Sequence, residues 1–538
     1  MTNNFLGFSI KFIFFYLILF FLGRGIHILL NNFKKIQETK NKVFGININI
    51  FYPILGLIYL GNFLIILNFF LPLNSLSTYI LLLPVLVNIK SLPKIKIFKN
   101  LPFYLIFLIP SYDVTYNYDA GLYHLGFQNL LRENNIVLGV SNIYGPYGVS
   151  SIYDYISSAL WFDKDFVFFQ FLNVIFIVFF YEFLYQGVVQ KKYNILKNIS
   201  ICLIIFSILD NFGFGGGRNG FIYFQGIGKQ DIAVAVLFLI TAILIYLSLI
   251  SNKLTVNEFF IISLLSIFII QLKVSGFPIL FFYMFMIFQI FRQNKFNYKF
   301  ISTILTTFFI GAIWIIKTVL QTGCIIYPLS QTCFERLKWT SIEYTNITRE
   351  SAINFSNYYS FNYSFLDWFN NYIDYELNKI IIYNFLISFL IIKILFFKRN
   401  FVSKNEFKLS MYFLFLVSLI FYLYFGPDSR YLIGIQLFFV SLIGIFGKPR
   451  FEIKEFVLIS LIFLSSISLI RLSSYQNFDL TTSPKNTIPV PEVIFYDNRL
   501  TPKDGDQCWA VINCSPNKFE YQISYDGFFK IVELKYEK

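Results

Sequence analysis

About fourteen apolar runs divide this chain, most of them near the ~17–25 residues that an α-helix needs to cross a bilayer. Charged residues make up only 14% of the 538 positions, against ~25% in ordinary soluble proteins, which is too few to coat several soluble domains. The sequence therefore predicts an all-α polytopic membrane protein with about 12–14 transmembrane helices. The runs lie near residues 5–30, 48–70, 76–89, 101–110, 166–186, 199–210, 232–250, 259–272, 277–291, 301–318, 379–397, 409–425, 431–446 and 456–470.

Basic residues between the runs predict how the chain lies in the membrane. The net charge is +14, but the Lys and Arg residues form short clusters in alternate loops. This positive-inside pattern indicates a multi-pass membrane protein whose basic loops face the cytoplasm, and it argues against a nucleic-acid partner. We expect a transmembrane domain over 1–470 and a small cap over 471–538, with both termini and the long loops 111–165, 211–231 and 319–378 on the outer side.

The cysteines and the C-terminal segment predict the form of the cap. Cys324 and Cys333 share one outer loop, and Cys508 and Cys514 share the tail, so two local disulfides are expected on this oxidising side. The alternative is four unrelated thiols. Two alternating stretches around Asp526-Gly527 predict a β-hairpin. The cap is therefore expected to be a small β or α/β unit.

The first outer loop carries the residues best suited to acid–base chemistry. Asp113 and Asp119 follow the fourth apolar run, and Tyr123 and His124 follow Asp119 by about one helical turn. Asp119 could act as a general base, or it could cap a helix N-terminus. His124 could be an acid–base group or an orienting residue, or simply an interfacial partner of Asp119. With two His and five Cys in the whole chain, a three-His zinc site is excluded.

Cations near the outer ends of apolar runs form the second group of candidates. A charge in an apolar helix is costly, so it usually faces a cavity or a partner. The glycine-rich segment 209–231 is not a nucleotide-binding P-loop, because no Gly-Lys-Ser/Thr closes it. Its glycines suit backbone contacts to a phosphate, or else an irregular salt-bridged loop. The cations are Arg218, Lys229, Lys273 and Arg430, and Asp231 follows Lys229 by two residues. Arg430 could equally pair with Asp428 at the surface.

Several short motifs resemble an uncharacterised family of bacterial multi-pass membrane proteins that is related in pattern to the GT-C glycosyltransferases. They are YDAGLYHLGF (118–127), NIYGPYGVSSIY (142–153), GGRNGFIYFQGIGKQD (216–231), QLKVSGFP (271–278), TGCIIYPL (322–329), PDSRY (427–431) and GDQCWAVINC (505–514).

The GT-C resemblance implies an inverting transfer of a sugar from a polyprenyl-phosphate donor to an envelope polysaccharide or lipid acceptor, at the periplasmic face of the bacterial inner membrane. Asp119 would deprotonate the acceptor hydroxyl, with His124 and Asp113 as further catalytic candidates. Tyr123 and Asp231 would line the substrate, and Arg218, Lys229, Lys273 or Arg430 would hold the lipid phosphate. A divalent cation is left as a possible cofactor, although no residues are assigned as its ligands. The alternatives are a transporter or flippase of lipid-linked saccharide, a polysaccharide polymerase or ligase, and a non-catalytic assembly subunit.

Overall fold

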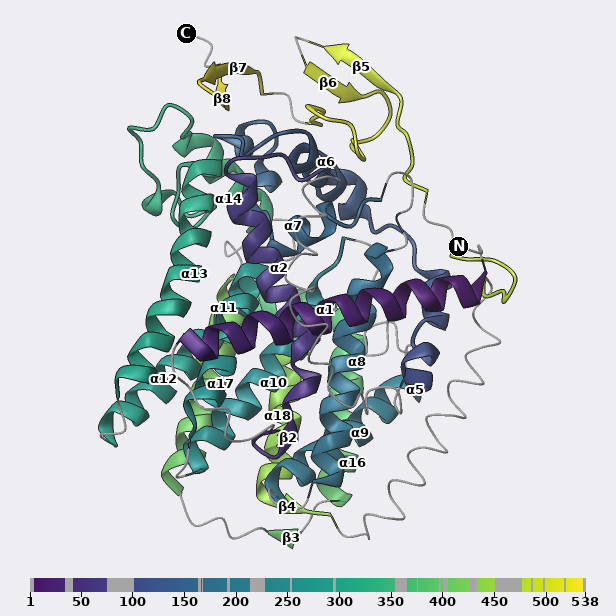
Figure 1. Ribbon diagram of the computed structural model, residues 1–538, viewed down its shortest axis with the longest axis vertical. Coiled ribbons are helices and arrows are strands. Elements are labelled where there is room, and N and C mark those ends of the chain that lie inside the picture. Colours follow the sequence, from purple (N-terminus) through teal and green to yellow (C-terminus); the bar gives the residue numbers. More distant parts are fainter. Residues whose placement is uncertain are drawn as a thin grey trace.

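The chain is mostly helical in the computed structural model (Figure 1). The structure describes residues 4–33, 42–74, 101–162, 166, 168–190, 194–212, 228–251, 254–293, 297–353, 365–374, 376–395, 398–399, 405–425, 431, 433–449, 477–484, 487–496, 499–516 and 519–535. The longer helices are α1 (Phe5–Phe33), α2 (Tyr52–Asn68), α8 (Phe168–Val189), α9 (Asn194–Phe212), α10 (Asp231–Ile250), α11 (Val256–Leu272), α12 (Ile279–Arg292), α13 (Tyr298–Thr322), α14 (Ile342–Ile353), α16 (Glu376–Leu395), α17 (Asn405–Phe425) and α18 (Ile433–Phe446). The shorter ones are α5 (Leu101–Ile106), α6 (Leu125–Glu133), α7 (Ile152–Ser158) and α15 (Phe365–Asp374).

Within the described residues, 6 helices are long and apolar enough to cross a membrane, and shorter apolar helices accompany them. They indicate a multi-pass membrane protein, as the sequence predicts. The predicted runs at 76–89 and 456–470 lie outside the described residues, so the full count of about 12–14 stays a prediction. The long candidates are Phe5–Asn31, Ile48–Asn68, Phe168–Val189, Asp231–Ile250, Val274–Arg292 and Tyr298–Thr322.

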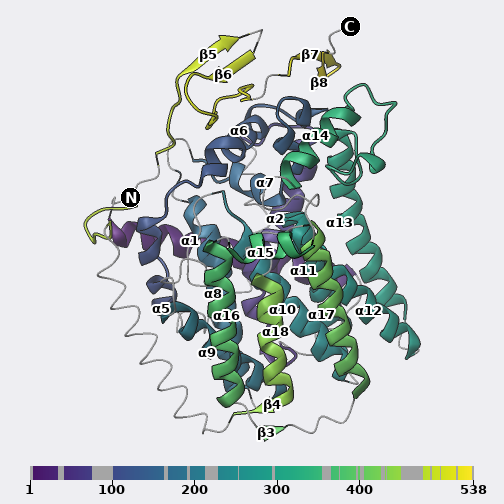
Figure 2. The same cartoon turned by 180° about the vertical axis from the view of Figure 1, so that it is seen from behind.

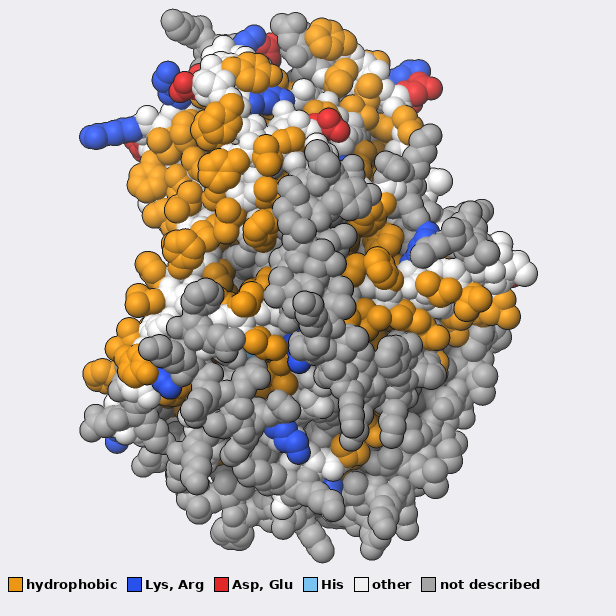
Figure 3. Space-filling model, viewed as in Figure 1, with side chains coloured by type: hydrophobic (Ala, Val, Ile, Leu, Met, Phe, Trp, Pro, Cys, Tyr) orange, Lys and Arg blue, Asp and Glu red, His pale blue; other side chains and the backbone are white. Residues whose placement is uncertain are grey.

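The candidate spans differ in how much of their surface is covered. Every residue in the most apolar stretch of α10 is buried, so this helix forms the centre of the bundle. On α13 only 28% of the corresponding stretch is buried, and Phe308 and Phe309 are 72% and 65% exposed. Figure 3 shows hydrophobic side chains along the left edge of this face, where Figure 1 places α13. Such an uncovered apolar face suits contact with lipid tails.

Glycines let α1 and α2 approach one another closely. In Figure 1, α1 runs across the front of the bundle, at a steep angle to α8 and α10. A Cβ atom added to Gly23 would lie 1.9 Å from the carbonyl oxygen of Tyr52, and one added to Gly56 would lie 2.2 Å from that of Leu19. Small residues at such crossings bring helix backbones together, as in many membrane bundles.

The two ends of the bundle carry different structures. At one end, β3 (Lys398–Arg399) pairs with β4 (Gly447–Lys448), which joins two loops that the sequence places on the same side. A further short pair, β1 (Lys42–Val43) with β2 (Ile46–Asn47), precedes α2. Figure 2 shows the C-terminal strands at the opposite end, above α6 and α7.

The described tail residues form two antiparallel hairpins, which confirms the prediction of small β structure. β5 (Val493–Tyr496) pairs with β6 (Arg499–Pro502), and β7 (Tyr521–Asp526) pairs with β8 (Phe529–Leu534) around the predicted turn. Leu138 pairs with β8 through two backbone hydrogen bonds. Its N–H donates to Lys530 O, and its carbonyl accepts from Val532 N.

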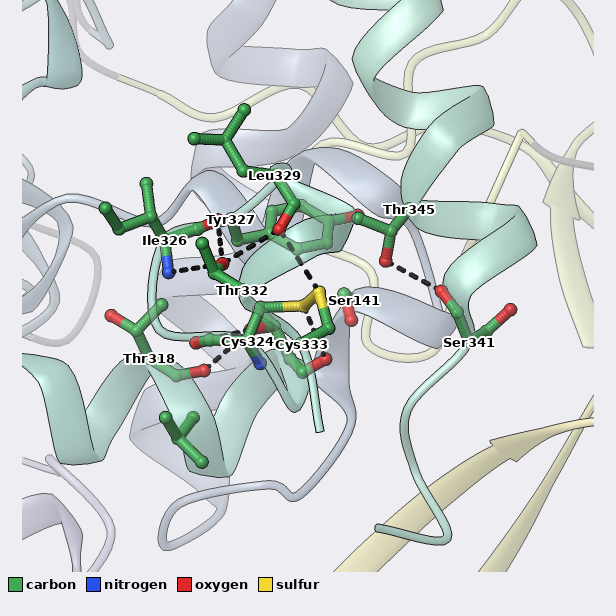
Figure 4. Close-up of a disulfide and its surroundings, with 12 residues drawn as sticks. Ser141, Thr318, Cys324, Ile326, Tyr327, Leu329, Thr332, Cys333, Ser341 and Thr345 are labelled. Carbon is green, nitrogen blue, oxygen red and sulfur yellow. Dashed lines mark hydrogen bonds between the residues drawn. A yellow bond between two sulfur atoms is a disulfide. The ribbon is translucent and has the colours of Figure 1, made fainter. Parts of the chain in front are cut away.

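Both predicted disulfides are present. Cys508–Cys514 closes a short loop of the tail, and Cys324–Cys333 closes the loop that follows α13. Figure 4 shows the Cys324–Cys333 bond. In the same loop the Thr332 hydroxyl accepts from the backbone N–H of Ile326 and donates to its carbonyl. Cys202 is a free, buried thiol in α9, consistent with a core residue.

Candidate functional site

The ends of three apolar helices meet beneath the first outer loop. α10 begins at Asp231, α11 ends at Leu272, and Tyr431 lies two residues before the start of α18. Above them lies η5 (Ala120–His124), a single π-helical turn that continues into α6. The predicted residues from segments 118–124, 229–231 and 273 therefore lie at one end of the bundle.

Asp119 and Lys229 form an ion pair across this boundary. The Lys229 and Asp119 side chains are only 13% and 22% exposed. Asp119 occupies the N-cap position of η5, yet its side chain makes no capping hydrogen bond. The cap alternative therefore does not describe this side chain, whose carboxylate binds a cation from a segment 110 residues away.

A second ion pair joins Lys273 to Asp231, with Nζ 2.6 Å from Oδ1. Lys273 has extended backbone between α11 and η8 (Val274–Gly276), so it terminates a helix and does not lie within one. Its ammonium group lies 4.1 Å from the centre of the Tyr431 ring, a cation–π contact. Asp231 is almost fully buried, while 28% of the Lys273 side chain is exposed. The lysine therefore remains accessible at one edge of the site.

Tyr123 lies near both ion pairs. Burial raises the pKa of its phenol well above the usual value, and the charges of Asp119, Asp154 and Asp231 and the nearby Tyr431 raise it further. Those contributions place the ring among residues from α7, α10 and the start of α18. A phenol with so high a pKa stays protonated, so it can donate a hydrogen bond to a ligand oxygen.

Asp154, not Asp119, is the partner of His124. The His124 Nδ1 atom lies 2.8 Å from Asp154 Oδ1, and both side chains are buried. Sequence reasoning missed Asp154, although Ser151 and Asp154 form a capping box at the start of α7. That spacing places an acid in the first turn of α7, but it does not reveal that the acid faces His124.

The cavity beside the second ion pair is small. Asp231, Ser275, Tyr431 and Gly434 line it together with apolar residues of α10 and α18, and its volume is about 10 Å³. This is room for about one water molecule. A cavity of this size, as the described residues line it, is too small for a lipid tail. A lipid carrier would therefore have to lie elsewhere along the bundle.

Two other groups of predicted residues lie apart from this site. The carboxylate of Asp113 accepts hydrogen bonds from the backbone and side chain of Asn477, so it fastens the tail. Arg218 and Arg430 lie outside the described residues. Among the residues that the structure does describe, no three His, Cys, Asp or Glu side chains are grouped as a metal site would need.

The tail loop that contains the Cys508–Cys514 disulfide lies against η5. Trp509 N donates to the carbonyl of Gly121 at 2.7 Å, and Tyr118 hydrogen-bonds the Asp506 carboxylate. A Cβ atom on Gly121 would lie 2.9 Å from the Trp509 ring, so only glycine allows this close fit. The tail therefore borders the site next to Asp119.

The comparisons identify a family but no activity. One family model matches residues 8–437, and its description is "Domain of unknown function (DUF8201)". That range includes every residue of the two ion pairs and the His124–Asp154 pair. Searches of curated proteins and of solved structures found no match.

Proposed function

This chain belongs to the DUF8201 family, and we propose that it is a GT-C-like glycosyltransferase of the bacterial inner membrane. It would move a sugar from a polyprenyl-phosphate donor to an envelope polysaccharide or lipid acceptor at the periplasmic face. The observation that carries the proposal is the pair of Lys–Asp ion pairs, Lys229–Asp119 and Lys273–Asp231, at the ends of apolar helices. They combine anion-binding and proton-accepting groups, which a transfer from a lipid phosphate to a hydroxyl acceptor would need.

The lysines suit the phosphate of the donor. Ammonium groups bind phosphate through charge-assisted hydrogen bonds, which are stronger than neutral ones. Lys273 keeps part of its surface exposed, and both lysines can exchange a carboxylate for a phosphate without becoming isolated charges. The Tyr123 hydroxyl adds a neutral donor near them.

Asp119 is suited to act as the base for the acceptor hydroxyl. In the empty site its carboxylate is engaged in the ion pair with Lys229. When the donor phosphate attracts Lys229, Asp119 becomes available to remove the proton from the attacking hydroxyl. Substrate binding and base activation are thereby coupled, and an empty site keeps its charges paired.

The proposal is tested by incubating membranes that contain the protein with a radiolabelled polyprenyl-phosphate sugar and a crude envelope acceptor. Label in a new glycosidic product supports the transferase. Label that crosses the membrane on an unchanged carrier would show a flippase. Joining of preassembled lipid-linked chains would show a polymerase or ligase.

Replacing Lys229 with glutamine should weaken donor binding. Glutamine keeps a hydrogen-bond donor but loses the charge, which is worth about 1.5–3 kcal/mol for a charged hydrogen bond. The KM for the donor should therefore rise at least ~10-fold. Lys503→Gln is the matched control. Lys503 follows β6 and forms an exposed ion pair with Glu492, which precedes β5. Equal donor KM values for the two variants would contradict the phosphate role.

The periplasmic placement of the site is tested by labelling single cysteines in intact cells. A membrane-impermeant maleimide should label a cysteine at position 503, in the tail, without permeabilisation. A cysteine at position 448, in β4 at the other end of the bundle, should react only after the membrane is opened. The reverse pattern would place the site in the cytoplasm.

A further inference from the structure

A cavity of about 370 Å³ lies away from the two ion pairs, and the proposed sugar transfer does not use it. It is bordered by α1, α5, α8, the β1–β2 hairpin and η1 (Ile48–Ile50), and Figure 1 places β2 toward the end of the bundle that carries β4. Small-molecule sites usually measure ~300–1,000 Å³, so the cavity has the size of a ligand site. We propose that it binds a saccharide group, with Glu182 as the acceptor for its hydroxyls.

Amide side chains dominate the polar wall of this cavity. Four of its described lining residues are amides, namely Asn47 and Asn49 from the hairpin side and Gln186 and Gln190 from α8 and the residue that follows it. An amide can both donate and accept hydrogen bonds, and so can a sugar hydroxyl. A wall of this kind can therefore satisfy several hydroxyls of one ligand at the same time.

Glu182 supplies a buried carboxylate at the inner wall. The Tyr104 hydroxyl donates to its Oε2 at 2.7 Å, and Gln186 Nε2 donates to its Oε1 at 3.0 Å. These two neutral donors fix the orientation of the carboxylate, which can accept about four hydrogen bonds in all. A ligand hydroxyl that donates to Glu182 would form a charge-assisted hydrogen bond, which is stronger than a neutral one.

The hairpin side of the cavity is held in place before any ligand binds. Gln186 uses its other amide atom, Oε1, to accept from the backbone N–H of Asn47 at 2.7 Å. At the hairpin turn, Phe44 is buried, and its N–H donates to Glu258 Oε1 at 3.0 Å. A wall that is already ordered loses little conformational entropy when a ligand binds, which favours affinity.

Three side chains at the rim have polar groups that can turn toward a ligand. Within the part of the chain that the structure describes, the side chains of Lys42, Asn49 and Tyr185 make no hydrogen bond or ion pair, and all three line the cavity. Tyr185 is half exposed on α8. The rim therefore adds an ammonium, an amide and a phenol to the groups at the inner wall.

The charges around the cavity favour a hydroxyl-rich ligand over a metal ion or a multiply charged anion. Its described lining residues include one carboxylate, Glu182, and one ammonium group, Lys42. A structural metal ion would need several anionic or imidazole ligands, and none are grouped among the residues that the structure describes. The rings of Tyr16 and Tyr104, with centres 5.5 Å apart, add apolar faces against which the C–H groups of a sugar can pack.

The saccharide can be free or attached to a lipid, because the groups that would recognise it are the same. The sequence predicts that the basic loops at this end face the cytoplasm, so the ligand would come from that side. Tyr185 and Val189 expose 50% and 53% of their surfaces on α8 beside the cavity, which suits a neighbouring lipid. The experiment therefore has one arm for each source.

Binding is measured with the full-length protein in nanodiscs of phosphatidylglycerol and phosphatidylethanolamine, which contain no sugar. In the soluble arm, methyl glycosides of glucose, galactose, mannose and N-acetylglucosamine are titrated by calorimetry. In the lipid arm, native mass spectrometry counts monoglucosyl diacylglycerol and polyprenyl-phosphate glucose retained by the protein. We expect one bound molecule per chain for at least one of these compounds. The arm that shows binding identifies the source of the saccharide.

Two variants connect the binding to the cavity. Glu182→Gln keeps the shape of the side chain but loses the charge, so the dissociation constant should rise at least ~10-fold. Asn49→Leu removes a rim amide that makes no side-chain hydrogen bond among the described residues, and it should weaken binding about 2–10-fold. Glu492→Gln, which removes an exposed carboxylate in the tail, is the control and should leave binding unchanged.

Three results would overturn the proposal. The first is no binding of any compound in either arm, and the second is unchanged affinity in both cavity variants. The third is selective retention of phosphatidylethanolamine that Glu182→Gln abolishes, which would show a site for an ammonium head group instead. The thermal unfolding midpoint shows whether each variant is folded, and Asn49→Leu decides the matter if Glu182→Gln does not fold. None of these measurements requires sugar transfer, so the proposed function can fail while this site stands.

Discussion

Replacing Asp119 with asparagine is expected to lower sugar transfer about 10²–10⁴-fold, the range that general base catalysis contributes. Asparagine has the same shape and keeps a carbonyl oxygen, but it cannot accept a proton from the acceptor hydroxyl. Binding of the donor should not be lost with it, because Lys229 would no longer be shared with a carboxylate. The signature is a collapse of kcat with an unchanged or lower KM for the donor.

A matched variant separates this effect from general damage. Asp374 forms an exposed ion pair with Lys379, with Nζ 3.0 Å from Oδ1. Asp374→Asn makes the same chemical change there and should leave transfer unaffected. Both variants should insert into membranes in similar amounts, measured by immunoblot of the membrane fraction. Full activity in Asp119→Asn would remove Asp119 as the base.

The two ion pairs show what the sequence could and could not predict. A charge within apolar sequence usually faces a cavity or a partner, which singles out Lys273. Lys229 stands out as part of the glycine-rich segment 209–231 next to apolar runs. Their partners could not be predicted, because Asp119 is 110 residues from Lys229 and Asp231 is 42 residues from Lys273. Such pairings depend on how the helices pack.

The disulfides and the β7–β8 hairpin could be predicted because their signals are local. Cys508–Cys514 spans six residues, and the hairpin turn follows directly from Asp526-Gly527. Lys317 could not be singled out in the same way, since it lies near the end of an apolar helix, where a lysine usually reaches the interface. The structure instead buries it against Ser150.

The π-helical turn was also beyond sequence reasoning. Counting four residues from Asp119 predicts Tyr123 on the same face of a helix, which the structure supports through the charge of Asp119 on the phenol. The same counting directs His124 to another side. In the structure the Tyr123 and His124 rings nevertheless lie side by side, with centres 4.2 Å apart.

Replacing Gly23 with valine is expected to be the most destabilising single change in the described bundle. The first new carbon atom would lie 1.9 Å from Tyr52 O and 2.6 Å from Gly56 N, and neither backbone atom can move aside without shifting α2. Overpacking usually costs about 1–3 kcal/mol, and values above ~4 occur where a rigid contact is broken. We expect the upper end here, because α2 also packs on α7 and α13.

The midpoint of thermal unfolding in detergent measures this cost, with Gly311→Val as the control. Gly311 lies in α13, where the nearest atom to an added Cβ is the end of the Ile267 side chain at 3.2 Å. A flexible side chain can give way, so Gly311→Val should cost less than ~1 kcal/mol. Equal unfolding midpoints for the two variants would show that the close approach of α1 and α2 does not stabilise the bundle.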